Sequence, residues 1–366
     1  MKITNVEPIL VSLPYEHGAP KPHRNSIGSW NTLDILFVKV DTDAGITGWG
    51  EAFGHASSPV TVSAISEIIS KLAVGREIDD KGILIPDLTR RTQSMARGGP
   101  VGFALSGLDI ALWDIAGKAA NKPVWNLLGG SKTKPIPAYA SLFRCTTPEA
   151  ISIVSRKAVE CGYKHIKLHE HDPETIAAAR RAIGPNISLM VDTNCFWTSA
   201  EEIISICEKI QRYDIKWLEE PLYPADSYDL LAEIRKKTKV PFAAGENLGN
   251  FNDLRWLIAS SAVDYIQPSI AKIGGITGLL KSAEFARQKS VKLAPHSPYL
   301  GPALVAAMHV ITAMPEEIIC EHRFCELGEN PIGQTIVSKN GHLHLTDKPG
   351  LGLDIDLDVI QKFRRN

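Results

Sequence analysis

The stretch Ser188-Leu-Met-Val-Asp-Thr-Asn194 decides the fold, because it is a short apolar run that ends in an acidic residue. Two later runs end in the same way, Ile215-Lys-Trp-Leu-Glu219 and Pro241-Phe-Ala-Ala-Gly-Glu246. The acidic residues Asp192, Glu219 and Glu246 follow one another at intervals of 27 residues, which suits one strand, one helix and two loops of a βαβ unit. Carboxylates at successive strand ends of a parallel barrel would meet at one mouth, and their mutual repulsion would require a cation.

Strand and helix patterns alternate from Ile136 onward and predict an α/β fold of the (β/α)8 type, a TIM barrel, over residues 131–325. Short apolar runs predict its eight strands at 136–142, 165–169, 188–193, 215–220, 241–246, 264–270, 291–296 and 317–322. A doubly wound sheet is the alternative, but its dinucleotide fingerprint should follow the first strand. The glycine cluster at 274–278 comes far too late for that, so the barrel is favoured.

Residues 1–130 predict an α+β capping domain in front of the barrel. Strands are expected at 2–13 and 33–53, with a hairpin turn at Asp43-Ala-Gly45, followed by helices at 60–73, 82–96 and 102–120. Between the strands, the polar loop 15–31 has the length of a mobile segment that covers a site. The tail, residues 326–366, has short strands and a final helix, and we expect it to return to the capping domain and complete it.

Composition excludes several classes of function. The net charge of −1 and the pI near 6.8 give no electrostatic footprint for nucleic acid. No apolar run reaches the roughly 18 residues of a membrane span, and the first residues lack the apolar core of a signal peptide. The six cysteines are scattered without a CxxC pair, so reduced thiols and a cytoplasmic location are expected rather than disulfides or a zinc site.

Ionisable and polar residues gather at the expected carboxyl ends of the barrel strands, where barrels of this type carry their chemistry. The candidates are Lys167 and His169, Asp192 and Asn194, Glu219, Glu246, Ser269, His296 and Glu321. Alternation along a strand puts Lys167 and His169 on one face and the apolar Ile166 and Leu168 on the other. The apolar pair would pack on helices, so the lysine and the histidine are expected to lie inside the barrel.

Each candidate also has an ordinary structural explanation. One acidic residue at a strand end is commonly a helix cap, but three at equal spacing favour a hard cation with oxygen ligands, most simply Mg²⁺. Zinc stays open because of nearby histidines such as His169. Lys167 could serve only as an ion-pair partner, whereas His296 lies in the loop-like Ala294-Pro-His-Ser-Pro298, which favours exposure to a cavity. Cys195 is interpreted as a packing residue, since no motif ties a histidine to it.

These residues carry a resemblance to the enolase superfamily, and within it to the mandelate racemase-like subgroup, that covers nearly the whole chain. The motifs are Asp192-Thr-Asn194, Trp217-Leu-Glu-Glu-Pro221, Gly245-Glu-Asn247, Lys272-Ile-Gly-Gly-Ile-Thr-Gly278 and the seventh-strand histidine His296. The resemblance implies that Asp192, Glu219 and Glu246 bind one Mg²⁺, and that Lys167 and His169 take the place of the family's Lys-x-Lys. It also places Glu321 beside the substrate carboxylate, with Asn194, Glu220 and Ser269 in supporting positions.

Two departures from the family pattern shift the expected reaction. The second lysine is replaced by His169, and the aspartate that partners the seventh-strand histidine is replaced by Ser269. Loss of the aspartate makes His296 a better general acid than base, while His169, or Lys167 if neutral, would remove the α-proton. We therefore expect a lyase that converts a hydroxylated carboxylate, a sugar acid, to a metal-stabilised enediolate and then eliminates the β-hydroxyl as water.

Two other readings stay open. A racemase, epimerase or cycloisomerase would use the same enolate intermediate, and a catalytically weak binding relative would use none. The partner is expected to be a small carboxylate, recognised at its far end by His17, His23 and Arg24 of the loop 15–31 and by His55, although no motif identifies the acid. By analogy with the family we also expect a symmetric homo-oligomer.

Overall fold

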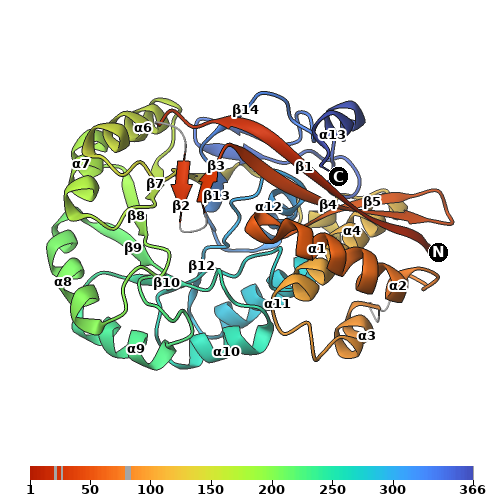
Figure 1. The fold of residues 1–366 in the computed structure, drawn as a ribbon, viewed down its shortest axis with the longest axis horizontal. Helices are drawn as coiled ribbons and strands as arrows, with labels where there is room; N and C mark the ends of the chain where they lie inside the picture. The colour runs from red at the N-terminus through yellow and green to blue at the C-terminus, as the bar shows by residue number, and fades with distance from the viewer. Residues whose placement is uncertain (20–22, 26–27, 79–83, 366) are drawn as a thin grey trace.

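The computed structural model describes residues 1–19, 23–25, 28–78 and 84–365, and for 23–25 and 28–30 the backbone alone. Two parts of the structure lie side by side: a ring of strands and helices, and a sheet with helices packed against it (Figure 1). The predicted class, a (β/α)8 barrel with an α+β capping domain, is confirmed. None of the helices in these ranges combines the length and the apolarity needed to cross a membrane.

The first seven barrel strands pair in parallel in chain order, and the eighth pairs in parallel with the first. They are β6 (Ile136–Ser141), β7 (His165–Leu168), β8 (Ser188–Asp192), β9 (Ile215–Glu219), β10 (Phe242–Ala244), β11 (Tyr265–Ile266), β12 (Lys292–Leu293) and β13 (Cys320–Arg323). Because the strands are parallel, all their carboxyl ends open on one mouth. The predicted strands are all present, and the last begins three residues later than expected, at Cys320.

Helices alternate with the barrel strands and surround them (Figure 1). They are α6 (Pro148–Glu160), α7 (Pro173–Ile183), α8 (Ala200–Ile210), α9 (Tyr228–Lys237), α10 (Phe251–Ala259), α11 (Gly275–Gln288) and α12 (Pro302–Ala313). Short 3-10 segments lie at His55–Ser57 and Gln211–Tyr213. Local sequence starts several of these helices: Ser199 and Glu202 form a reciprocal capping box at α8, and Asp172 accepts from the Thr175 amide at α7.

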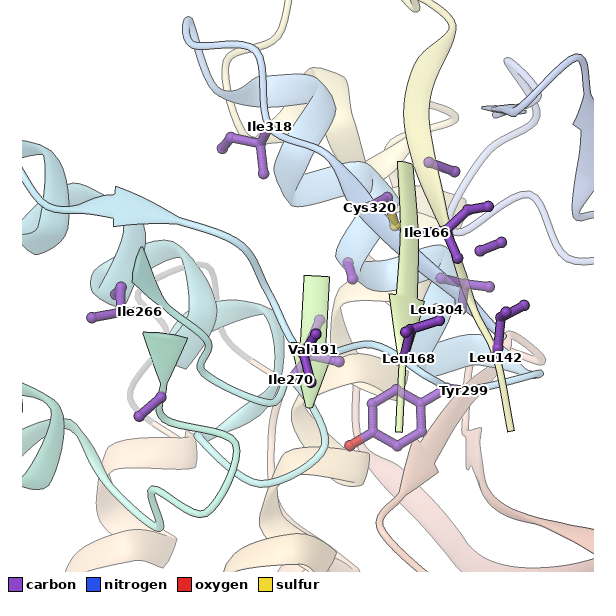
Figure 2. Close-up of a cluster of buried hydrophobic side chains, with 14 of the residues drawn as sticks. Leu142, Ile166, Leu168, Val191, Ile266, Ile270, Tyr299, Leu304, Ile318 and Cys320 are labelled. Atoms are coloured by element: carbon purple, nitrogen blue, oxygen red, sulfur yellow. The ribbon is translucent and has the colours of Figure 1, made fainter. Parts of the chain in front are cut away.

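Alternation along the barrel strands separates an apolar shell from a polar interior, as the pattern at β7 predicts. Ile166 and Leu168 are fully buried in the apolar cluster that also contains Leu304 of α12 (Figure 2). Lys167 between them is also fully buried but faces the carboxylates inside. The pleat of a strand therefore turns one short sequence into both a packing surface and a site wall.

The capping sheet runs in the order β14-β1-β4-β5. Its strands are β1 (Ile3–Glu16), β4 (Thr32–Thr42), β5 (Thr47–Ala52) and β14 (Glu326–Leu327), and its helices are α1 (Ser58–Ala64), α2 (Ser70–Ala73), α3 (Leu84–Arg91) and α4 (Pro100–Ala119), with a π-helical segment at Ile65–Ile69. Helix α4 lies so close to β5 that a Cβ on Gly50 would come within 2.0 Å of the Gly107 carbonyl oxygen. Only glycine fits there.

The tail contacts both parts of the molecule. Strand β14 pairs with β1, and Arg364, just after α13 (Leu357–Phe363), bridges to Val11. The hairpin of β15 (Val337–Lys339) and β16 (His342–His344) instead adds to β6 of the barrel, and the short α5 (Val124–Leu127) joins the cap to the barrel. Within the loop expected at 15–31, β2 (His23–Asn25) and β3 (Gly28–Trp30) form a small antiparallel hairpin.

Candidate active site

Three acidic side chains, here called the carboxylate trio, meet at the mouth of the barrel. Asp192 and Glu219 are the last residues of β8 and β9, and Glu246 follows β10 by two residues. One carboxylate oxygen from each lies within 4.8 Å of the other two, and Asp192 and Glu219 are almost completely buried. The all-carboxylate donor set and this spacing fit a hard cation such as Mg²⁺, whose oxygen ligands lie at about 2.1 Å.

The electrostatics of the trio point the same way. Burial and the neighbouring Asp192 charge raise the pKa of Glu219 well above its usual value. Burial also opposes ionisation of Asp192 and Glu246, but nearby cationic groups, chiefly Lys167 and His296 respectively, hold both pKa values below their usual range. Two buried carboxylates and a third that is partly buried, so close together, cannot all be ionised at low cost without a bound cation.

Lys167 forms the cationic side of the mouth. Its Nζ lies 2.7 Å from Glu219 Oε1, 3.1 Å from Asp192 Oδ2 and 2.9 Å from Glu321 Oε1. Burial acts to lower the pKa of Lys167, but Glu219, Glu321 and Asp192 outweigh it and raise the pKa well above the usual value. A lysine held in its charged form has no lone pair to accept a proton, so this geometry favours an electrostatic role.

His169 is oriented by the backbone. Its Nδ1 faces the Leu142 carbonyl oxygen at hydrogen-bond distance, and because a carbonyl only accepts, Nδ1 must carry a proton. Nε2 lies 3.3 Å from Asp192 Oδ2 at the edge of the trio, and because this carboxylate only accepts, it favours a proton on Nε2 as well. When the ring is neutral and keeps its proton on Nδ1, Nε2 is the atom with the lone pair. The arrangement provides a base whose accepting atom faces the cation site.

His296 occupies the other flank, on the loop after β12. Its Nε2 lies 3.0 Å from Glu246 Oε2 and its Nδ1 lies 3.1 Å from Ser269 Oγ. Since a carboxylate only accepts, the proton of the neutral ring lies on Nε2. The Ser269 hydroxyl also hydrogen-bonds the Tyr299 hydroxyl, so a neutral chain from Ser269 to Tyr299 stands where the family has an aspartate.

The predicted supporting residues hold the trio and its neighbours in place. Asn194 donates from its backbone and side-chain nitrogens to Asp192 Oδ1, each at 3.0 Å. Glu220 turns away from the trio and accepts from the Gly245 amide at 2.8 Å; burial and Glu246 raise its pKa to about 8. Glu321 also accepts from Ser141 Oγ at 2.8 Å and from the Ser297 amide at 2.9 Å.

Of the substrate-recognition residues expected in the capping domain, the structure describes the side chains of some and not of others. His17 is buried, with its ring 4.7 Å from that of Phe143 just after β6. His23 and Arg24 are on β2, and their side chains lie outside the described residues. Burial, and after it the charges of Arg323, Lys272 and His296, lowers the pKa of His55 to about 3.

Three residues at the site have no role in the sequence analysis. Trp217 donates from Nε1 to Glu219 Oε2 at 2.9 Å. Lys272 is nearly buried, with its Nζ 4.2 Å from the centre of the Phe53 ring, and burial lowers its pKa. Tyr299 completes the chain behind His296. Trp217 and Lys272 lie in quoted motifs and Tyr299 follows His296 by three residues, but no periodicity distinguishes them from packing residues.

A barrel with an α+β cap, three carboxylates at successive strand ends and a buried lysine beside them defines a class of metal-dependent carboxylate enzymes. The family described as mandelate racemase / muconate lactonizing enzyme, N-terminal domain, matches residues 11–129, and the enolase C-terminal domain-like family matches residues 151–359. The chain belongs to the mandelate racemase-like subgroup of the enolase superfamily.

Curated relatives cover the chain from end to end. It is 30% identical to the D-galactarolactone cycloisomerase of Agrobacterium fabrum, over 100% of this chain and 99% of the relative. It is 28% identical to the arabinonate dehydratase of Saccharolobus solfataricus, over 91% of each. A solved enolase structure from Bradyrhizobium, complexed with magnesium and mandelic acid, shares 29% identity and a TM-score of 0.87, covering 100% of this chain and 99% of the other.

Proposed function

We propose that this protein is an Mg²⁺-dependent lyase that removes the α-proton of a sugar acid and eliminates the β-hydroxyl as water. The observation that carries the proposal is the pair of histidines on the two flanks of the trio. His169 contacts Asp192 from β7, and His296 contacts Glu246 from the loop after β12. Dehydration needs a base and an acid at separate positions, and these two rings differ in which role their surroundings support.

His169 is proposed as the base. The Leu142 carbonyl holds the proton on Nδ1, so Nε2 accepts the α-proton directly. Of the two candidates left open by the sequence, Lys167 is disfavoured because three carboxylates keep it charged. It is proposed instead to stabilise the negative charge that develops on the substrate carboxylate when the α-proton leaves.

His296 is proposed as the acid. The doubly protonated ring gives its Nε2 proton to the departing hydroxyl, so that water leaves and the ring becomes neutral. The Glu246 carboxylate, 3.0 Å from Nε2, stabilises the charge of the doubly protonated ring. The Ser269 hydroxyl accepts from Nδ1 and keeps the ring oriented while the Nε2 proton leaves.

One Mg²⁺ per site is proposed to be held by Asp192, Glu219 and Glu246. When bound, it would supply positive charge to the substrate carboxylate and lower the cost of removing the α-proton. Support comes from the all-carboxylate donor set and from the magnesium in the Bradyrhizobium structure. Zinc is less suited because no histidine belongs to the cluster found among the described residues.

A cycloisomerase is the second candidate, and the similarity to the D-galactarolactone cycloisomerase specifically favours it. Such a reaction begins with the same proton removal but breaks or forms an intramolecular C–O bond, so the product keeps the mass of the substrate. A racemase or epimerase would return the proton to the α-carbon. A catalytically weak relative would bind the acid without exchanging its proton.

The deciding experiment incubates the protein with Mg²⁺ and a panel of sugar acids and their lactones in deuterated water. Mass spectrometry reports loss of water, and NMR reports exchange at the α-carbon. A product lighter by one water supports the lyase. A product whose mass differs from that of the substrate only by incorporated deuterium supports the isomerases. Absence of exchange on every acid refutes the proposal.

The assignment of His296 has its own test, the His296→Asn variant. We expect product formation to fall by about 10²–10⁴-fold, the usual contribution of a general acid, while α-proton exchange continues. Full turnover in this variant would show that another group protonates the leaving hydroxyl.

A cytoplasmic location and a symmetric homo-oligomer are further proposals. All six cysteines are free thiols in the structure, as is usual in a reducing compartment. Sedimentation of the purified protein at several concentrations tests the oligomer.

A further inference from the structure

A carboxylate of the capping domain holds the start of a barrel helix. Glu51 on β5 is buried, and its Oε2 accepts from the Ala303 amide at 2.8 Å, across 252 positions of sequence. The Gly301 amide also donates to this carboxylate. Helix α12 has no side-chain cap of its own, since its N-cap residue is Gly301. The cap for these orphan N–H groups therefore comes from the other domain.

Gly301 lets Glu51 approach the backbone closely, because it has no side chain. A Cβ at this position would come within 2.8 Å of both Glu51 Oε2 and Ile35 Cγ2. No ion pair of Glu51 is found in the part of the chain that the structure describes, so its carboxyl group faces the helix N-terminus without a cationic side chain. Burial raises the pKa of Glu51 to about 8, against the lowering effect of the Ala303 and Gly301 N–H groups. Burying this carboxyl group costs free energy, which its hydrogen bonds with the two N–H groups partly offset.

The segment that Glu51 holds leads directly to the proposed acid. Residues 295–301, here called the His296 loop, connect β12 to α12 and carry His296 and Tyr299. From the barrel side the loop is fixed by Glu321, which accepts from the Ser297 amide at 2.9 Å, and by Arg323, whose Nε donates to the Pro298 carbonyl at 3.0 Å. From the cap side, among the described residues, Glu51 binds its far end.

Tyr299 links that far end to the histidine. Its ring lies in the same apolar cluster as Leu304 of α12 (Figure 2), and its hydroxyl hydrogen-bonds Ser269, which in turn contacts His296 Nδ1. A shift of Gly301 would therefore move Tyr299, two residues earlier, and with it the partner of His296. The cost of even small misplacement is high, because proton transfer needs hydrogen-bond distance.

We propose that Glu51 is a positioning residue for the reaction: by capping α12 from the capping domain it sets the His296 loop, and through Tyr299 and Ser269 the orientation of the acid His296. The inference rests on the proposed function, in which His296 acts only in the second step, the elimination of the hydroxyl. Glu51 touches neither the trio nor His169 in the described structure, so the first step, α-proton removal, should not depend on it.

The test compares Glu51→Gln with Asp114→Asn. Both changes turn a buried capping-domain carboxylate that accepts from backbone amides into a carboxamide. Asp114 accepts from the Trp49 and Leu351 amides and also pairs with Lys118 at 2.7 Å, away from the His296 loop. At about pH 9, where Glu51 is largely ionised, Glu51→Gln replaces a charged acceptor by a neutral carboxamide and weakens the hydrogen bonds from the Ala303 and Gly301 amides. Hydrogen exchange of the intact protein should become at least about ten-fold faster at these amides, and only in the Glu51 variant.

The functional readout is the ratio of product formation to α-proton exchange on an acid that the wild type converts. We expect Glu51→Gln to lower this ratio about ten-fold or more with exchange nearly unchanged, and Asp114→Asn to leave it unchanged. A parallel fall of both rates, an unchanged ratio, or the same shift in Asp114→Asn overturns the proposal. A wild type that exchanges no acid instead refutes the proposed function, while the amide exchange still tests the cap.

A second variant covers the case in which Glu51→Gln does not fold. Tyr299→Phe removes only the hydroxyl that contacts Ser269 and keeps the ring in its apolar cluster. It should lower the same ratio, because the orientation of His296 is transmitted through that hydroxyl. A folded Tyr299→Phe protein with the wild-type ratio overturns the proposal.

Discussion

The role of His169 can be tested with a substitution that keeps its structural contact. In His169→Asn, the side-chain amide nitrogen takes the approximate place of Nδ1 and can still donate to the Leu142 carbonyl. The change removes Nε2, the atom that lies 3.3 Å from Asp192 Oδ2 and faces the cation site. The variant therefore separates the position of the side chain from its basicity.

The expected loss follows from what a placed base contributes. General-base catalysis supplies about 10²–10⁴-fold, which corresponds to about 3–5 kcal/mol of activation free energy at about 1.4 kcal/mol per decade. Lys167 cannot take over, because its contacts with three carboxylates keep it protonated. We therefore expect α-proton exchange to fall by at least about 100-fold.

The assay follows deuterium incorporation at the α-carbon by NMR, with Mg²⁺ and an acid that the wild type exchanges. His165→Asn is the matched control, since His165 begins the same strand and lies at the far end from the mouth. The control should exchange at the wild-type rate. Wild-type exchange in His169→Asn, or an equal loss in His165→Asn, would refute the assignment of the base.

Three further predictions concern stability. Mg²⁺ at one hundred times its Kd should stabilise the wild type by about 2.7 kcal/mol and so raise its thermal midpoint. In a thermal-shift titration, Glu219→Gln should largely lose this rise; an equal rise in both proteins would argue against the site. Lys167→Met should cost about 3–5 kcal/mol in denaturant unfolding without Mg²⁺, because it leaves buried carboxylates unpaired, and the cost should shrink when Mg²⁺ is added. Burial raises the pKa of Asp109 from 3.8 to about 7, so between about pH 4 and about pH 7 the folded protein keeps a proton on Asp109 that the unfolded chain has lost. The free energy of unfolding, relative to that of Asp109→Asn, should therefore fall by at most about 4 kcal/mol as pH rises from about 4 to about 7. A difference between the two proteins that does not change with pH in denaturant unfolding would contradict this.

The barrel and the trio could be predicted from the sequence because both depend on short-range patterns. Strand and helix periodicities are local, and a parallel barrel places every strand end at one mouth. Equal spacing of Asp192, Glu219 and Glu246 was therefore enough to bring them together, and alternation on β7 was enough to put Lys167 inside. The same reasoning, together with the family resemblance, predicted His169 or Lys167 as the base and His296 as the acid.

The proposed choice between Lys167 and His169 as the base rests on tertiary contacts. Whether Lys167 or His169 is the base depends on three carboxylates from β8, β9 and β13 around the lysine and on the Leu142 carbonyl behind the histidine. None of these partners is near in sequence, so no local pattern reports them. A pKa depends on distance through space and on burial, and both exist only after folding.

The sequence by itself thus determined the chemistry class of this protein: a barrel, a cap and three carboxylates poised to bind a cation. Only the tertiary structure decided how the proton-transfer groups are held. Ser269 stands where the family pattern has an aspartate, and its hydroxyl hydrogen-bonds the Tyr299 hydroxyl. Glu51 reaches α12 from another domain because the cap packs against the barrel at that point. Contacts of this kind link residues that are distant along the chain, and packing alone brings them together.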